Sequence, residues 1–451
     1  MPVDSKGSPL ALEPGSADNP DSMAWLWKDH TSAAEAEELT ALVSGAYPEV
    51  IARVGGSYSS EWYWAKALRC ARVSPHISER AHTWVELQDW IPAVLTDARG
   101  AISRGVCAAG HKGLYSALWG GFPPRELLAT LHPDLARFRD SLPAQVQPVS
   151  YATGGLCPAW AQALGIPQGT SVATGGIDAH MGAVGAGVAP GRPVKILGTS
   201  SCDIAVSPLT EGLPYISGIS GIVPESVLPG MAGIEAGQAA VGDLFNWWSA
   251  LCGQSHEELA EGALALRPGE SGLLALDWNN GNRSVLADPR LSGLILGQTL
   301  HTGRADVYRA LIEAAAFGAR IIIETFEAAG VPVNSLIACG GIAEKSPLTL
   351  QIYANVCVKP IAVSRSRETC ALGAAMAGAV ASKALPDFDS ATAAMCRVGA
   401  RLYEPDASAA AIYGRLFQMY RNLHDAFGRG EMTPLGDVME ELGKIRAKAA
   451  L

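Results

Sequence analysis

Residues 169–206, GTSVATGGIDAHMGAVGAGVAPGRPVKILGTSSCDIAV, decide the fold, because strand, turn and helix signals follow one another within this one stretch. The short β-branched run at 171–174 predicts a strand, and the pair Gly175-Gly176 predicts the turn that ends it. Small residues from 177 to 185 predict a helix that opens with Asp178. A strand that leads through a glycine turn into a helix is typical of an α/β protein.

A β-hairpin is predicted after this helix. Strands are expected at 193–197 and 202–206, and the tip between them, Gly198-Thr199-Ser200-Ser201, combines a glycine with three hydroxyl side chains. Gly, Ala and Pro cluster at 187–191, and this cluster predicts a boundary between two lobes.

A second α/β unit is predicted further along the chain. Apolar residues at helical spacing predict a long helix over 306–329, which the Gly-Val-Pro run that follows would end. The next expected elements are a strand at 335–339, the pair Gly340-Gly341, a helix capped by Ser346 with Pro347 at its first position, a strand at 360–363 and a helix at 371–381. The glycine pair therefore follows a strand at its carboxyl end, where open α/β sheets bind ligands.

The first third of the chain shows helical patterns and few strand signals. Helices are expected within 31–44 and 59–73, and Thr31 or Ser32, followed by Glu35 and Glu37, predicts a side-chain cap at the start of the first.

The tail from Tyr403 is expected to be helical, solvated and structural in role. These patterns divide the chain into a first lobe over 1–187, a second lobe over 188–400 and a helical tail over 401–451.

Composition excludes several classes of protein. The 451 residues are 48% hydrophobic and 17% charged, which suits a sizeable core and excludes disordered and fibrous chains. Lys and Arg number 34 against 44 Asp and Glu, so the formal net charge is −10, and no stretch concentrates basic residues. Nucleic acid is therefore not expected as a partner.

The chain carries no signal for a membrane or for secretion. Its longest strongly apolar stretch, 370–381, is shorter than the roughly 20 residues that span a bilayer. Residues 1–20 lack the apolar segment of a secretory signal, which predicts a cytoplasmic protein. Nine cysteines without a C-x-x-C pair or a histidine cluster at ligand spacing predict reduced thiols, several of them buried, and no structural zinc. The oligomeric state stays open, a homo-oligomer included.

Asp178 is the first candidate for chemistry. A carboxylate at a helix start is favoured in its ionised form, and the glycines before it let a substrate approach the backbone, so Asp178 could act as a general base. An ordinary helix-capping aspartate explains the same residue equally well.

Three further features each have two interpretations. The hairpin tip at 198–201 could bind an anion or be a polar turn, and Gly340-Gly341 could face a ligand or only turn the chain. Lys112 could pair with a polar substrate, although most single lysines are solvated surface.

The order of these features and the residues in them resemble a known family. The stretches that carry the resemblance are LWKDHT at 26–31, YSSEW at 58–62, 107–112, 178–187, GTSSCD at 198–203, 237–238 with 241–243, DWNNGNRS at 277–284 and 340–347. They are similar to the FGGY carbohydrate kinases and, within that family, most similar to the L-ribulokinase group. The resemblance implies a two-lobed α/β fold of the actin and hexokinase (ribonuclease H-like) type.

The resemblance also implies a reaction and its residues. It implies transfer of the γ-phosphoryl group of ATP, with Mg²⁺, to the 5-hydroxyl of L-ribulose, with Asp178 as the base. Lys112 and Glu235 match positions that hold the sugar, and no residue is implied for the metal. The nucleotide half of the cleft is matched by Gly198, Thr199, Ser200, Gln238, Gly340 and Gly341. Open alternatives are another pentulose or polyol kinase, such as a xylulokinase or a D-ribulokinase, and a non-catalytic sugar-binding relative.

In one place the sequence departs from the family. Members open with a strand, an Asp-x-Gly-Thr turn and a second strand, and no Asp-x-Gly occurs here. We therefore expect the first lobe to be incomplete, either because the true start lies upstream of Met1 or because the protein is a truncated relative. Phosphoryl transfer by the chain as written is expected to be impaired, since one of two phosphate-contacting elements would be absent.

Overall fold

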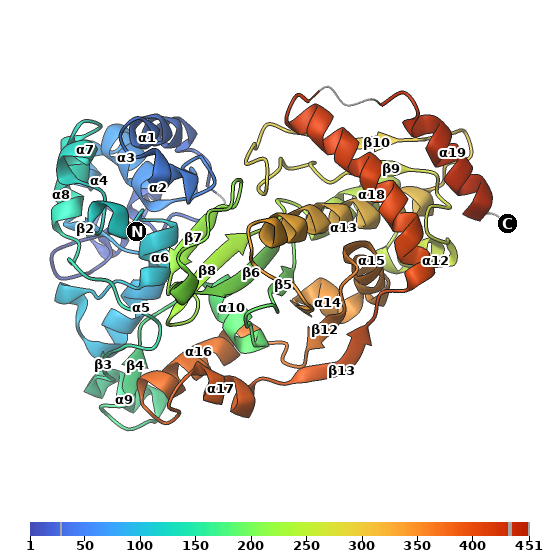
Figure 1. Cartoon of the computed structure of the whole chain (residues 1–451). Helices are drawn as coiled ribbons and strands as arrows, with labels where there is room; N and C mark the ends of the chain where they lie inside the picture. Colours follow the sequence, from blue (N-terminus) through green and yellow to red (C-terminus); the bar gives the residue numbers. More distant parts are fainter. Residues whose placement is uncertain (28, 432–434, 450–451) are drawn as a thin grey trace.

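The computed structural model describes residues 1–27, 29–431 and 435–449, and it places a largely helical N-terminal part beside a part built on a central sheet (Figure 1). Lys28, within the LWKDHT stretch, lies outside the described residues. No helix in the described ranges has the length and apolar character that a bilayer crossing requires. All nine cysteines are free, and four of them are buried, as expected from the sequence.

The central sheet has seven strands in the order β13-β12-β11-β5-β6-β8-β7. Their bounds are β5 Val194–Leu197, β6 Ser201–Pro208, β7 Gly221–Pro224, β8 Met231–Ala236, β11 Leu336–Cys339, β12 Ile361–Ser364 and β13 Val398–Tyr403. β5 and β6 form the predicted hairpin, with Leu197 paired to Ser201. The two edge strands, β13 and β7, and β8 next to β7 were not predicted from the sequence.

The predicted β-α-β unit is also confirmed. β11 runs parallel to β5 on one side and to β12 on the other. Because β5 and β11 are parallel neighbours, their carboxyl ends lie at the same edge of the sheet. The turns that follow them, at Gly198 and at Gly340-Gly341, therefore come together there.

Two small-residue helices, α10 (Asp178–Ala186) and α16 (Thr369–Ala381), cover one face of this sheet and pack against each other (Figure 1). A Cβ atom on Gly185 would collide with the Thr369 carbonyl, and one on Gly373 would collide with the Met181 carbonyl. The small residues that predicted these helices are therefore what lets their backbones touch.

The long helix α13 (Arg304–Ala328) lies in the core of the second part, and its bounds confirm the predicted helix. It packs against α15 (Pro347–Cys357). The predicted cap of α15 is present, since Ser346 Oγ accepts a hydrogen bond from the Thr349 amide at 3.4 Å. The short helix α14 (Gly341–Lys345) before it was not predicted.

The tail forms α18 (Ala407–Gly428) and α19 (Val438–Ala449). The expectation that this tail is simply solvated is wrong, because one face of α18 is part of the core. Tyr413, Phe417 and Tyr420 lie three and four residues apart, are buried and pack around Phe317 of α13. The division at 187–188 and 400–401 stays a prediction.

The N-terminal part is mostly helical, as expected. Its two small sheets pair β1 (Pro2–Val3) with β2 (Thr83–Trp84) and β3 (Ala152–Gly155) with β4 (Ser171–Ala173). The helices are α1 Ala33–Ala46, α2 Pro48–Ala52, α3 Tyr63–Val73, α4 Pro75–Arg80, α5 Leu87–Thr96, α6 Val106–His111, α7 Arg125–Ala129, α8 Pro133–Asp140 and α9 Pro158–Leu164. Elsewhere lie α11 Gly242–Cys252, α12 His256–Ala265, β9 Leu274–Leu276, β10 Leu294–Leu296 and α17 Phe388–Met395.

The prediction of a side-chain cap at the start of α1 is wrong, because no side chain makes a capping hydrogen bond there. Ser32 occupies the cap position but makes no capping bond. Its hydroxyl instead donates to the Ser60 carbonyl at 2.7 Å, which ties the helix start to the YSSEW stretch.

Candidate active site

Asp178 is the first residue of α10, directly behind the Gly175-Gly176 turn. Its side chain is exposed, and its Oδ1 accepts a hydrogen bond from the neighbouring amide of Ala179 at 2.8 Å. Ile177, not Asp178, occupies the cap position of the helix. The carboxylate is thus placed at the positive end of the helix dipole and remains accessible to a substrate.

Lys112 closes α6 and makes an ion pair with Glu86, with 3.5 Å between Nζ and Oε2. Burial works against the charge, but the carboxylates of Glu86 and Glu235 outweigh it and raise the pKa of Lys112. The lysine is therefore a fixed cation beside Glu235 and not a solvated surface residue.

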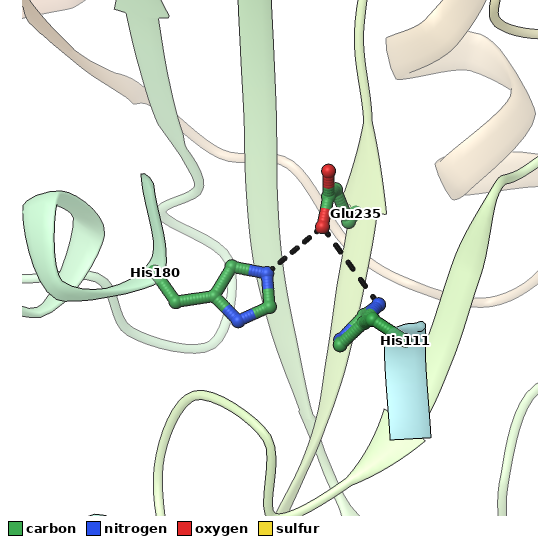
Figure 2. A group of neighbouring side chains, drawn as sticks. All are labelled: His111, His180 and Glu235. Atoms are coloured by element: carbon green, nitrogen blue, oxygen red, sulfur yellow. Dashed lines mark hydrogen bonds and ion pairs between the residues drawn. The ribbon is translucent and has the colours of Figure 1, made fainter. Parts of the chain in front are cut away.

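Glu235 lies on β8 and is bound by a histidine from α10 (Figure 2). The Nε2 atom of His180 lies 3.0 Å from Glu235 Oε2, and Nδ1 of His111 lies 3.7 Å from the same oxygen. Burial alone would raise the pKa of Glu235, yet the hydrogen bond and charge of His180, with smaller contributions from His111 and Arg283, lower it to about 2. Glu235 is therefore ionised and acts only as an acceptor.

The two histidines are themselves held in place from behind. Cys107 Sγ lies 2.9 Å from Nδ1 of His180, and Ser226 Oγ lies 3.0 Å from Nε2 of His111. Burial and the neighbouring His180 lower the pKa of His111 to about 3, so its imidazole is neutral. Both rings are buried, and neither was singled out from the sequence.

Three of the stretches that carry the family resemblance meet at Glu61. Its carboxylate lies 3.8 Å from Arg283 of the DWNNGNRS stretch and 3.9 Å from His30 of the LWKDHT stretch. The guanidinium of Arg283 also lies over the Trp27 ring, 6.0 Å from its centroid. Arg283 contributes to the low pKa of Glu235, so this junction of the two parts of the chain lies near the candidate sugar site.

The hairpin tip turns its carbonyls toward α11. The amides of Val241 and Asp243 donate to the Thr199 carbonyl at 2.9 and 3.1 Å, and the Gly242 amide donates to the Gly198 carbonyl at 3.0 Å. The Thr199 side chain stays exposed, whereas Gly198 and Ser200 are half-buried. The tip is thus fixed by its backbone, and the side chain of Thr199 is exposed.

The two glycines after β11 differ in whether the backbone conformation and the surrounding atoms require a glycine. Gly340 has a φ of +94°, and a Cβ atom there would lie 2.5 Å from the Leu197 carbonyl. At Gly341 the φ is ordinary and a Cβ atom would meet nothing within 4 Å. The fold therefore requires Gly340 and leaves open space beside Gly341.

Gln238 is buried and fully engaged by the protein. Its Nε2 donates to Asp277 Oδ2 at 2.8 Å and to the Ala315 carbonyl at 2.7 Å, and its Oε1 accepts from Lys195 at 3.1 Å. Lys195 in turn contacts both carboxylate oxygens of Asp203 at 2.9 Å. The side chain of Gln238 thus braces the sheet behind the hairpin tip.

Two groups of predicted residues are brought together. Lys112, Glu235 and the helix that opens with Asp178 form one group, and Gly340 lies against Leu197, the residue before Gly198, at the sheet edge. Sequence reasoning missed Glu86, His111 and His180. The only available signal was position, since both histidines lie inside quoted stretches, next to Lys112 and two residues after Asp178.

Comparison with known proteins assigns the family. A family model described as the FGGY family of carbohydrate kinases, C-terminal domain, matches residues 194–382. The chain is 40% identical to a ribulokinase from Shouchella clausii, with 100% of this chain and 82% of the relative covered. A ribulokinase from Mycolicibacterium smegmatis is 39% identical, with 99% and 79% covered. The chain belongs to the ribulokinases, within the FGGY family of carbohydrate kinases.

Solved structures support the same fold for this FGGY kinase. A xylulose kinase from Rhodospirillum rubrum aligns with a TM-score of 0.75 at 24% identity, covering 88% of this chain and 78% of that one. Plasmodium falciparum glycerol kinase with ADP aligns with a TM-score of 0.72 at 17% identity, covering the same shares. The predicted actin and hexokinase type of fold is confirmed, and as a kinase of this family the chain takes a sugar and ATP as substrates.

Proposed function

We propose that this enzyme transfers the γ-phosphoryl group of ATP to the 5-hydroxyl of L-ribulose, giving L-ribulose 5-phosphate and ADP, as a step of L-arabinose catabolism in the cytoplasm. The observation that carries the proposal is the placement of Asp178, an exposed carboxylate at the mouth of α10. Two residues later on the same helix, His180 binds Glu235, and the relatives of the chain are ribulokinases.

Asp178 is proposed as the general base. Its carboxylate would accept the proton of the sugar hydroxyl as the hydroxyl oxygen attacks the γ-phosphorus. The bond between that phosphorus and the oxygen bridging to the β-phosphate then breaks, and ADP leaves. Catalysis of phosphoryl transfer rests mostly on positioning and electrostatics, so the fixed neighbours of Asp178 matter as much as the base.

Lys112 and Glu235 are proposed to hold the sugar. An ammonium group donates hydrogen bonds and an ionised carboxylate only accepts them, so the two together can fix the direction of neighbouring hydroxyls. Both side chains are partly buried and each is held by a second residue, Glu86 or His180. Little conformational freedom is left to lose when a sugar binds.

The nucleotide is proposed to bind at the edge where β5 and β11 end. Thr199 offers an exposed side chain that carries a hydroxyl, with Gly198 and Ser200 beside it, and the space next to Gly341 lets a ligand approach the backbone. Gln238 would act from behind, because its backbone amide donates to Ser201 Oγ at 3.2 Å and so steadies the tip.

Mg²⁺ is expected with ATP, and oxygen ligands are what it requires. The carboxylates of Asp178 and Asp243, at the mouths of α10 and α11, are exposed and fit this need. Asp203 does not, since Lys195 binds both of its oxygens. When bound, Mg²⁺ neutralises phosphate charge, which is the chemistry it supplies to kinases.

A substrate panel tests the proposal. ADP release by the full chain is measured with L-ribulose, D-ribulose and D-xylulose, with Asp178→Asn as the inactive control. We expect the highest kcat/KM for L-ribulose, and the absolute rate measures the impairment expected from the sequence. A higher value for another pentulose would reassign the substrate, and no sugar-dependent ADP release would favour a non-catalytic sugar-binding protein.

A further inference from the structure

His111, His180 and Glu235 form a compact group of potential metal ligands (Figure 2). One nitrogen of each ring and one oxygen of the carboxylate all lie within 4.8 Å of one another. The three side chains come from α6, α10 and β8, so only the folded chain assembles them. No such group was expected from the sequence, where the histidines do not have ligand spacing.

We propose that these three side chains bind a divalent transition-metal ion of the Zn²⁺ type, and that the bound ion excludes the sugar. The second half of this proposal rests on the proposed function, because it takes Glu235 as a sugar ligand. The first half rests only on the geometry of the group. The proposed ion is an inhibitor and is distinct from the Mg²⁺ that accompanies ATP.

The donor set suits Zn²⁺ and not Mg²⁺. Two imidazole nitrogens and one carboxylate oxygen are a ligand set found at zinc sites, where a fourth position is left open. Mg²⁺ instead prefers oxygen ligands. Bond lengths of about 2.0 to 2.1 Å in a tetrahedral site place neighbouring ligand atoms roughly 3.3 Å apart. The distances from Glu235 Oε2 to His180 and His111, 3.0 and 3.7 Å, lie on either side of that value.

The outer contacts of the two rings also fit a metal site. Zinc-binding histidines almost always use the second ring nitrogen for a hydrogen bond that fixes the ring. Here Nε2 of His111 contacts Ser226 Oγ at 3.0 Å, and Nδ1 of His180 contacts Cys107 Sγ at 2.9 Å. The rings lie edge to face, with centroids 4.6 Å apart and planes at 73°. The nitrogens left for a metal are the ones that face Glu235. Metal binding displaces the proton that His180 Nε2 donates to Glu235 in the metal-free protein, as metal binding to histidine generally does.

Occupation of the group would interfere with the sugar for two reasons. The ion would engage Glu235 Oε2, an oxygen that is proposed to accept from a sugar hydroxyl. It would also add positive charge beside Lys112, whose ammonium group interacts with the Glu235 carboxylate. Inhibition should therefore be competitive with the sugar and not with ATP.

Binding is tested without sugar or nucleotide, so that failure of the proposed function cannot affect the result. The metal-free full chain is titrated with Zn²⁺ by calorimetry and with Co²⁺ by visible absorption, which reports tetrahedral coordination. We expect one equivalent to bind. His111→Gln and His180→Gln should each weaken binding at least tenfold.

Matched variants control for binding of Zn²⁺ to histidine and cysteine side chains elsewhere in the chain. His256→Gln removes a histidine that contacts Asn246 and Tyr308, away from the group, and should leave binding unchanged. Cys370→Ser removes the one cysteine that is exposed and should do the same. Circular dichroism and the unfolding midpoint show whether the His→Gln variants are folded.

Competition is then measured as the shift in the Zn²⁺ dissociation constant caused by L-ribulose. A rise of tenfold or more at saturating sugar would support the proposal. Binding that survives both His→Gln changes, or no tetrahedral Co²⁺ spectrum, would overturn the site. Binding at the site with no effect of sugar would overturn the exclusion of the sugar while leaving the proposed reaction intact.

Discussion

His180 Nε2 lies 3.0 Å from Glu235 Oε2, and the same helix begins two residues earlier with Asp178. Because Glu235 is ionised, the imidazole is the donor in this hydrogen bond. One turn of α10 thus carries the proposed base and also fixes the carboxylate proposed to hold the sugar. A shift of this helix would disturb both functions at once.

Asp178→Asn should lower kcat by about 10² to 10⁴, the usual contribution of a general base, with little change in the dissociation constant for L-ribulose. The amide keeps the shape of the side chain but accepts no proton. Steady-state kinetics and calorimetric binding of the sugar measure the two effects. Asp389→Asn, in the first turn of α17, is a matched control at an exposed position and should change neither. A variant that retains most of its turnover would contradict the assignment.

His180→Gln should raise KM for the sugar more than it lowers kcat. Glutamine can still donate to Glu235, but it carries no positive charge to stabilise the carboxylate. It also lacks the imidazole nitrogen that contacts Cys107, so Glu235 is held less firmly in its orientation. We expect KM to rise about tenfold, in line with the loss seen when supporting residues are removed at other sites. KM for ATP serves as the internal control, and an equal rise for both substrates would indicate general damage to the fold.

Gly340 and Gly341 should respond differently to substitution. Gly341→Val places a side chain in open space, so stability should hold while ATP binding weakens and sugar binding does not. Gly340→Ala requires a positive φ and a close approach to Leu197, so it should lower the unfolding midpoint. Calorimetric titration with ATP and thermal unfolding of both variants check this. Loss of both ligands in Gly341→Val would identify the pair as a structural turn.

The sequence predicted the turns and helix starts that depend on one or two residues at that position. The hairpin tip, the glycine turn after β11 and the capped start of α15 are confirmed, because glycine permits turn conformations that other residues avoid and proline fixes φ at a helix start. β8 was missed although it carries Glu235, since its strand character depends on pairing with β6 and β7.

The candidate site was predictable only in part for a similar reason. Asp178 and Lys112 were found through flanking glycines and family resemblance. The contact between His111 and Glu235 depends on how α6 packs against β7, beside β8, and no spacing in the sequence reports it. Gln238 is the reverse case. Its position matches the nucleotide half of the family's cleft, but its side chain is hydrogen-bonded to Asp277, Lys195 and a backbone carbonyl of the protein itself.

A buried aspartate in the first turn of α5, hydrogen-bonded to the residue before α6, predicts a pH dependence of stability. Asp89 Oδ1 accepts from the Gly105 amide at 2.9 Å, directly before the helix that carries His111 and leads to Lys112. Burial raises the pKa of Asp89 to about 6, although Arg104 and the Gly105 amide oppose the shift. The ordinary value is 3.8, so the folded chain holds this proton more tightly than the unfolded chain.

The sign follows from that difference. A raised carboxyl pKa favours the folded state while the proton is bound, so this contribution falls as pH rises from about 4 to 6 and is constant above. A shift of this size corresponds to roughly 3 kcal/mol. Asp89→Asn mimics the protonated acid and can still accept from Gly105, so it should be more stable than the parent at pH 7 and nearly equal at pH 4. Urea unfolding of both chains across this pH range measures the difference between their free energies of unfolding. The other titrating groups are the same in both chains, so their contributions cancel in this difference. A difference that is constant, or that widens toward low pH, would contradict the prediction.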